Sequence, residues 1–570
     1  MKTEASKDCG ISEPFSFVSV LGCAWPALLL ATVCLLPHLN KPFLNDDPHF
    51  LTMARQIVNH PMHPMDFTIC WNLRSDNCAK AYLITPGNAL MGYVLVPTVL
   101  SGTHEWTAHL TQLVLVWIAV IAMTSLILRF GWDRQHAIVG GLLLVAIAPF
   151  LPMATTAMPD ILATSLGLVA MERLAAWKTE QKWSQGAVSA IALGLAGFAR
   201  SHLALLLPLA AFYLLENADP KEFFAQFRRR FWLWTPVLAG SVLLVTIIAT
   251  VREHNLTINP PPIVKGLWHI PSNLTAYLLY LVFPIPLFVF WLANRLRTKP
   301  QRAAFILTMA AGITWFVHPE HLLKSGSLGG VIILTMAPGI TWFANPGHML
   351  VKLLAVVGFG MLTDLIYEAW DRADHTDLFL IFWILIPLPI VYYFHLAAKY
   401  LLPCMPAVIL LCFRLSAGFS AQRFRVAAIA LIVASTGYSL LILRSDAEFA
   451  KFGRDAMYRL IQPHVAAGER VWFADQFSAY WYAPLAGATL IFPGDPQPRP
   501  GDLLVVGLYE DGSLMSLRFP HRTLVDAVTH RYQFGRTMGA GVGLYTNLLG
   551  YWMWGVGDSA NDRYELWRID

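Results

Sequence analysis

The chain is organised around one stretch, Leu44-Asn45-Asp46-Asp47-Pro48-His49-Phe50. It follows the first long apolar segment, which runs from Phe17 to Leu36 and has about the 20 residues needed to cross a bilayer. Two adjacent carboxylates just outside such a segment are costly to place there without a function. The stretch therefore predicts an acidic site at the boundary between lipid and water.

The two carboxylates are expected to have different roles. Pro48 suits the first position of a helix, because its missing N–H needs no partner there. Asp47 then occupies the N-cap, where its side chain accepts a backbone N–H, and Asp46 is left free ahead of the helix. Apolar residues recur at helical spacing behind this start: Phe50, Met53, Ala54, Ile57 and Val58. A short amphipathic helix of this kind lies in the membrane interface.

The composition indicates a membrane protein with many spans. Of the 570 residues, 56% are hydrophobic and 14% are charged, and the mean hydropathy is +0.51, whereas soluble proteins carry about 25% charged residues. The net charge of +5 lies mostly in short loops, which is the positive-inside pattern and argues against nucleic acid as a partner. The first apolar segment lacks a small-residue cleavage site, so we interpret it as a retained span.

Basic residues in short loops set the expected topology, with five groups placed in the cytoplasm. These groups are Arg129 and Arg134; Lys178 and Lys182; Lys221 with Arg228, Arg229 and Arg230; Arg295, Arg297, Lys299 and Arg302; and Arg423 with Arg425. The loop from Asn40 to about Thr107 then stays outside, with a second short apolar piece, Asn88 to Leu100, at the interface. The fold class expected is a polytopic α-helical membrane protein of about 13 transmembrane helices. After the first, these are expected at roughly 108–129, 137–153, 160–177, 186–200, 202–216, 231–251, 273–294, 303–317, 353–370, 378–395, 401–416 and 426–443.

One internal repeat complicates this path. Ile306–Phe316 recurs with near-identity as Ile333–Phe343, 27 residues later. If both copies crossed the membrane, the basic loop at Arg423 would face outward. We therefore expect one copy within 306–348 to be re-entrant or to lie along the interface.

The composition changes after Arg444. Residues 1–444 are expected to form the membrane domain, and residues 445–570 are polar enough to form a small extracytoplasmic α/β domain. A helix is expected from Gln476 to Leu485. Short buried strands are expected at Val471–Phe473, Ala488–Phe492 and Asp502–Val506.

Charged side chains from four places converge on the outer face in this topology. They are Asp46 with Asp47, Asp160, Arg200 with His202, and Lys399 with Tyr400. The last three places each have a purely structural interpretation beside the functional one. Asp160 could cap a helix N-terminus, Arg200 could extend to lipid headgroups, and Lys399 could anchor the chain at the interface. Weaker signals come from two further loops: Arg252, His254, Lys265 and His269, and His318, His321, Lys324 and His348.

Together these groups suit transfer from a lipid-linked phosphate. A carboxylate takes the proton of an acceptor hydroxyl, and cations stabilise the departing phosphate as its charge develops. The sequence has no P-loop, no Gly-x-Gly-x-x-Gly after a strand and no His-Glu-x-x-His, so nucleotide-driven and zinc-hydrolase chemistry have no support. The seven cysteines form no metal framework, and for Cys70 and Cys78 in the first outer loop a disulfide and two free thiols are both consistent with the sequence.

The same residues resemble a known superfamily. Asp46-Asp47-Pro48-His49-Phe50, followed by Ala54-Arg55, resembles the Asp-Glu motif and helix in the first outer loop of GT-C glycosyltransferases. The most similar branch is the family 39-like one, with protein O-mannosyltransferases and the lipid A aminoarabinose transferase. The position of Asp160 along the chain also fits this family. A later match is the stretch Ala398-Lys399-Tyr400-Leu401-Leu402-Pro403, which resembles the Arg-Tyr-Leu-Leu-Pro pattern late in such chains. In order and spacing the resemblance covers about residues 15–445.

The resemblance implies a multi-pass protein of a bacterial-type inner membrane with an outer catalytic cavity, a polyprenyl-phosphate sugar donor and inversion at the anomeric carbon. By position, Asp46 would be the general base with Asp47 supporting it, and Asp160 would line the cavity. The donor phosphate would be bound by Arg200, His202, Lys399 and Tyr400. Family members differ in metal use, so a divalent metal at Asp46 and Asp160 stays open as a cofactor.

One departure from the family and two rival functions remain. Thr85-Pro86-Gly87-Asn88 stands where the family often has Lys-Pro-Pro, so that donor contact lacks its lysine.

A transporter or flippase is one rival, although it would favour charges near the membrane midplane and two symmetric halves. The other is a non-catalytic relative that binds membrane lipid. The sequence does not indicate which sugar is moved, whether the acceptor is a protein, a lipid or a glycan, or the oligomeric state.

Overall fold

The computed structural model describes most of the chain. The described residues are 16–70, 78–84, 89–215, 231–251, 269–283, 286–316, 349–474, 478–491, 497–507, 519, 521–539, 541–557 and 563–570. Three predicted features fall outside them: the stretch Thr85–Asn88, the outer loop 252–268, and the duplicated segment after residue 316 up to His348.

Seven helical segments in these residues are long and apolar enough to cross a membrane. They are α1 with η1 (Phe17–His38), α6 (Glu105–Arg129), η3 with α13 (Phe231–Ile248), α21 (Met349–Asp371), α22 with η5 (His375–Tyr392), η6 with α23 (Ala398–Ser416) and α24 (Ala421–Ala466). Helices α15 (Ile270–Val282) and α16 (Leu287–Thr298) are bent by 66° at their break and make an eighth span if they cross together. Shorter apolar helices are α7 (Arg134–Ala146), α10 (Trp183–Ala199) and η2 with α11 (Ser201–Leu214). The predicted polytopic helical membrane protein is confirmed.

Each predicted span falls on helical residues, including α9 (Asp160–Glu180) and α17 (Pro300–Phe316). Three spans differ in detail, and one of them is that expected at 273–294, which is bent between α15 and α16. The one expected at 137–153 is divided, because α7 ends at Ala146 and the short α8 (Phe150–Met153) follows a cis Ala148–Pro149 bond. The one expected at 378–395 ends early, because α22 (His375–Ile384) and η5 (Leu388–Tyr392) give way to non-helical backbone at 393–397.

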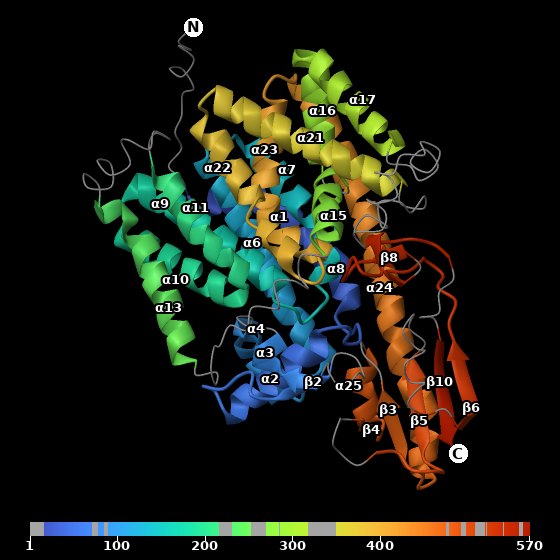
Figure 1. Cartoon of the computed structure of the whole chain (residues 1–570). Helices are drawn as coiled ribbons and strands as arrows, with labels where there is room; N and C mark the ends of the chain where they lie inside the picture. Colours follow the sequence, from blue (N-terminus) through green and yellow to red (C-terminus); the bar gives the residue numbers. More distant parts are fainter. Residues whose placement is uncertain are drawn as a thin grey trace, which may run out of the picture.

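The membrane helices pack into one bundle, shown in the upper part of Figure 1. α1 packs on α6 and α7, α6 packs on α9, and α10 packs on both α9 and α13, while α15 packs on α21. Large apolar side chains remain exposed on the outward faces of several helices, among them Trp25, Val242 and Val433. Exposed apolar surface of this extent is what a bilayer covers.

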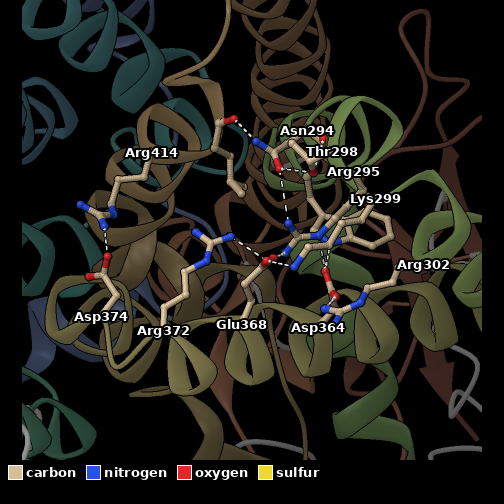
Figure 2. Close-up of polar contacts among 12 residues, drawn as sticks. Asn294, Arg295, Thr298, Lys299, Arg302, Asp364, Glu368, Arg372, Asp374 and Arg414 are labelled. Carbon is tan, nitrogen blue, oxygen red and sulfur yellow. Dashed lines mark hydrogen bonds and ion pairs between the residues drawn. The ribbon is translucent and has the colours of Figure 1, made fainter. Parts of the chain in front are cut away.

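The cations predicted for the loop near residue 300 form a charged network with α21. Arg295 Nε donates to Asp364 Oδ2 at 2.5 Å, and both Arg295 and Lys299 pair with Glu368 (Figure 2). Arg302 lies 3.5 Å from the second oxygen of Asp364. Figure 1 places α16, α17 and α21 at one end of the molecule and the C-terminal sheet at the other. The network therefore marks the end far from that sheet.

The first outer loop folds as a small unit. α2 (Asp47–Asn59) packs on α4 (Leu90–Val94) and α5 (Val96–Leu100). A hairpin of β1 (Thr68–Cys70) and β2 (Cys78–Lys80) leads into α3 (Ala81–Ile84). The predicted apolar face of α2 is buried except for Val58, which is exposed. That face is used to hold α2 against its own loop.

A single helix leads into the C-terminal part of the chain. α24 runs from Ala421 to Ala466, so the boundary predicted at residue 444 lies inside it. Beyond it, five strands form a mixed sheet in the order β4-β3-β5-β10-β6. Their bounds are β3 (Val471–Ala474), β4 (Thr489–Leu490), β5 (Leu503–Gly507), β6 (Arg522–Thr529) and β10 (Arg563–Ile569). α25 (Ser478–Leu485) connects β3 to its parallel neighbour β4, which confirms the small α/β unit.

A second, three-stranded sheet is formed by the part of the chain between β6 and β10. It contains β7 (Met538–Gly539), β8 (Gly541–Gly543) and β9 (Gly550–Trp552). The loop from Leu544 to Leu549 between β8 and β9 reaches back to the membrane helices, because Asn547 bonds to residues of α15 and of the segment before η6.

Candidate active site

Asp46 lies at the start of α2, directly after Asn45, whose φ of 54° turns the chain. Its carboxylate makes no capping bond to the helix. Instead, Asp46 Oδ2 accepts a hydrogen bond from Lys399 Nζ at 3.0 Å, across 353 residues of sequence. The Lys399 side chain is 2% exposed and that of Asp46 is 23% exposed. The carboxylate is therefore anchored on one side and still open to a ligand.

Asp47 has a structural role that differs from the predicted one. The helix begins at Asp47 with Asp46 in the N-cap position, so the prediction that Asp47 caps the helix is wrong. Its buried carboxylate accepts the N–H of Leu44 at 2.9 Å and the N–H of Ala157 at 2.7 Å. These bonds fix the first outer loop against the turn that precedes α9. Burial raises the pKa of Asp47 to about 7, against the opposing charge of Lys41 and the two backbone donors.

Asp160 and Arg200 form a second buried ion pair. Arg200 Nη2 donates to Asp160 Oδ1 at 2.7 Å, and both side chains are at most 10% exposed. Asp160 is the first residue of α9, and its side chain makes no capping bond there, so its alternative as an N-cap is wrong. The Arg200 guanidinium lies 5.2 Å from the centre of the Tyr400 ring. Two predicted donor-binding residues are thus in contact, with an acid beside them.

Lys399 and Tyr400 join the two pairs. Both belong to η6 (Ala398–Cys404), and Lys399 Nζ lies 3.2 Å from Met158 Sδ in the turn before α9. The Tyr400 hydroxyl lies 3.2 Å from His395 Nε2, and its ring packs edge-on to that of His202. The predicted residues Asp46, Asp160, Arg200, His202, Lys399 and Tyr400 therefore form one cluster, although they come from four separate segments.

The protonation states leave Asp46 ionised at neutral pH. Burial acts to raise the pKa of Asp46, but the adjacent Lys399 ammonium and its hydrogen bond outweigh burial and hold the pKa below its ordinary value. Burial lowers the pKa of His49 to about 4 and that of His395 to about 3, so both imidazoles are neutral at pH 7. The site at neutral pH therefore has an ionised carboxylate at Asp46 beside neutral imidazoles.

Four buried polar atoms of this cluster have no hydrogen-bond partner within the described part of the chain: Asp160 Oδ2, Arg200 Nε, His202 Nε2 and His395 Nδ1. Buried polar atoms are nearly always paired with protein or with another ligand. These four atoms give the cluster unused donors and acceptors, including one on the Arg200 guanidinium. They can bind a polar or anionic group.

The residues of the cluster do not fit a divalent metal. In the described residues no three His, Cys, Asp or Glu side chains gather closely enough to hold an ion. Asp46 and Asp160 are each paired with a cation of the protein itself. We therefore derive no chemistry from a metal at these two carboxylates.

A buried ion pair behind the cluster has no counterpart among the predicted residues. Lys41 Nζ donates to Asp446 Oδ2 of α24, and both side chains have no exposed surface. Asp446 also accepts from the Tyr545 hydroxyl at 2.7 Å, and the Tyr545 ring centre lies 5.7 Å from Lys399 Nζ. A lone lysine just after an apolar span was the available sequence signal for this pair, but nothing in the sequence indicated its partner 405 residues away.

Of the weaker sequence candidates, only His269 lies in the described residues. It is the residue before α15. Arg252, His254, Lys265, His318, His321, Lys324 and His348 lie outside them.

Fold and site together define a multi-pass membrane protein with a buried acid–base cluster. No protein-family model matches the sequence, and no curated protein matches it. Among solved structures, the chain is similar to ArnT from Cupriavidus metallidurans bound to undecaprenyl phosphate, with 12% identity, a TM-score of 0.44, and 96% of this chain and 98% of that chain covered. The apo state of the same protein is similar too, with 12% identity, 96% and 97% covered, and a TM-score of 0.40.

A third solved structure is the Archaeoglobus fulgidus oligosaccharyltransferase tethered with an acceptor peptide. It is 12% identical, with 83% of this chain and 64% of that chain covered and a TM-score of 0.41.

Proposed function

We propose that this protein is a membrane glycosyltransferase. It moves a sugar from a polyprenyl-phosphate donor to an acceptor hydroxyl on the extracytoplasmic side, and Asp46 is the general base. The observation that supports this most is the Asp46–Lys399 contact of 3.0 Å, which holds an ionised carboxylate and a buried cation in one partly open site.

The transfer is a single displacement. The acceptor oxygen forms a bond to the anomeric carbon while the bond from that carbon to the phosphate oxygen breaks. The acceptor proton passes to Asp46, and the electron pair of the broken bond leaves with the polyprenyl phosphate. Because attack and departure occur on opposite faces of the carbon, the anomeric configuration inverts. A positioned base contributes about 10²- to 10⁴-fold to such a step.

The cations serve the leaving group. Lys399 and Arg200 are fixed by Asp46 and Asp160, so they need little reorganisation as negative charge develops on the phosphate. The unpartnered Nε of Arg200 is a donor available to a phosphate oxygen. The His395 imidazole, which is neutral at pH 7, adds no fixed charge to the site.

The test is transfer of radiolabelled sugar by purified protein in lipid vesicles. A panel of polyprenyl-phosphate sugars is supplied together with a membrane fraction that contains lipid, glycan and protein acceptors. We expect label to move from one donor to an acceptor. Lys399→Met should reduce the rate by about 10²- to 10³-fold, the usual cost of losing one group that stabilises developing charge.

Lys299→Met is the matched control, because Lys299 also pairs with a carboxylate but lies in the network at the other end of the molecule. It should transfer sugar at the wild-type rate. A transporter or flippase would instead move the lipid-linked sugar across the vesicle bilayer without transferring it. A non-catalytic lipid-binding protein would retain the donor and do neither. Either result would overturn the proposal.

A further inference from the structure

The backbone just before Lys399 is irregular. Residues 393–397 form neither helix nor strand, and they connect η5 to η6 between two candidate membrane spans. Leu396 and Ala397 are buried, and buried backbone N–H and C=O groups without helical partners are costly unless protein groups satisfy them. Side chains from other elements must therefore provide these bonds.

Two asparagines do so. Asn547 Oδ1, from the loop between β8 and β9, accepts the N–H of Leu396 at 2.9 Å. Asn273 of α15 donates from Nδ2 to the carbonyl oxygens of Tyr393 at 2.7 Å and Val391 at 3.1 Å. The two amides are bonded to each other, because Asn547 Nδ2 donates to Asn273 Oδ1 at 2.9 Å. Both side chains are buried, and Asn547 also bonds to Ser272.

Leu396, whose backbone N–H donates to Asn547, lies three residues before Lys399 in the sequence. Only Ala397 and Ala398 lie between them, and η6 begins at Ala398. The position of Leu396 therefore sets where the first turn of η6 starts and where the Lys399 side chain points. The same loop also contributes Tyr545, whose ring centre lies 5.7 Å from Lys399 Nζ.

We propose that Asn547 is a positioning residue that holds Lys399 against Asp46. It acts through the backbone of Leu396 and is itself held by Asn273. Its role in the reaction rests on the proposed function, but the contact that it maintains can be tested without any activity. The C-terminal part of the chain thereby becomes a component of the candidate active site.

The test uses the protonation of Asp46 in the full-length protein. Asp46 faces the charges of Lys399 and Arg200, the adjacent Asp47, and the imidazoles of His49 and His395. A hydrophobic carbodiimide reacts with protonated carboxyl groups, so the extent of Asp46 labelling as a function of pH, measured by mass spectrometry, gives the pKa of Asp46. In the wild type this midpoint should lie below the ordinary value for an aspartate.

Asn547→Ala should move the midpoint upward by about 1 to 3 pH units, the range that an opposite charge within about 4–6 Å produces. Asn294→Ala is the matched control, because the Asn294 amide also bonds to a backbone group, in this case the carbonyl of Leu415, but at the far end of the molecule (Figure 2). Its midpoint should equal that of the wild type. An unchanged midpoint in folded Asn547→Ala would overturn the inference.

If Asn547→Ala does not fold, Asn547→Leu decides by the same measure, because leucine fills a similar volume and cannot accept the N–H of Leu396. A raised midpoint is expected there, and an unchanged one contradicts the role. The proposed function is judged separately. A wild type that transfers no sugar refutes the enzyme, whereas the labelling midpoints decide the positioning role in either case.

Discussion

At the scale of single residues, two adjacent carboxylates have different environments and so different roles. Asp46 is bonded to a side-chain cation and stays partly exposed, whereas Asp47 is fully buried and bonded to two backbone amides. Lys399 lowers the pKa of Asp46, and burial raises the pKa of Asp47. At neutral pH the first is ionised and open to a ligand, as the proposed base must be, and the second holds the loop.

Asp47→Asn should reduce stability rather than turnover. An asparagine side chain has one acceptor oxygen, so one of the N–H groups of Leu44 and Ala157 loses its partner. A buried donor left without a partner costs about 1–3 kcal/mol. Thermal unfolding in detergent should show a lower midpoint than for the wild type, while sugar transfer per folded molecule stays close to it.

Asp66→Asn, which changes an exposed carboxylate of the same loop, should leave the unfolding midpoint unchanged. If Asp47→Asn melts like the wild type but loses turnover, Asp47 takes part in the chemistry and its structural assignment fails.

At the scale of elements, the hairpin beside α2 bears on the two cysteines of the first outer loop. The register pairs Cys70 with Cys78, and Ala81 N donates to Phe67 O at 2.8 Å one step outside the ladder. Hydrogen-bonded and non-hydrogen-bonded pairs alternate along antiparallel strands, so Cys70 and Cys78 form a non-hydrogen-bonded pair with Cα atoms about 4.5 Å apart. That separation lies within the range that disulfides use.

We therefore expect a Cys70–Cys78 disulfide in protein isolated from the membrane. Digestion without reduction, followed by mass spectrometry, should give one linked peptide that separates on reduction. Recovery of both cysteines alkylated before any reduction would refute the bond.

The sequence predicted the helices well, because each depends on a local signal. The length of apolar runs and the basic residues between them placed all of the roughly 13 expected spans on helical residues, although seven described segments, or eight with α15 and α16, are long and apolar enough to cross a membrane. The breaks after Ala146, Val282 and Ile384 were missed. The predicted site residues cluster, but their pairing was not predictable, because Asp46 and Lys399 are joined across 353 residues. Asn273 and Asn547 carry no local signal at all, since a buried amide is recognised only from the backbone that it satisfies.

At the scale of the whole molecule, the two polar networks described above lie in different parts of the helix bundle. The Arg295–Asp364–Glu368 network is at one end, and the candidate active site is formed where α2, α9 and η6 meet the loop from the C-terminal part. In the proposed function the first end faces the cytoplasm, as the positive-inside rule predicts. The candidate site then belongs to the opposite side of the membrane.

Cysteine labelling checks this sidedness. Asn59→Cys in α2 and Arg423→Cys in α24 both introduce thiols at exposed positions, whereas the native cysteines Cys23, Cys34, Cys404 and Cys412 are buried and Cys70 and Cys78 are expected to be bonded to each other. A membrane-impermeant maleimide should label Asn59→Cys in intact spheroplasts and Arg423→Cys only after permeabilisation. The reverse pattern would place Asp46 on the cytoplasmic side and remove it from an extracytoplasmic reaction.

The most direct measurement is the single-turnover rate of sugar transfer by purified wild type and Asp46→Asn, with the donor prebound and the acceptor added last. The amide is nearly isosteric with the carboxylate but cannot take the acceptor proton, so the rate should fall by about 10²- to 10⁴-fold while the variant remains folded and still binds donor. Transfer by Asp46→Asn at the wild-type rate would show that this carboxylate is not the base.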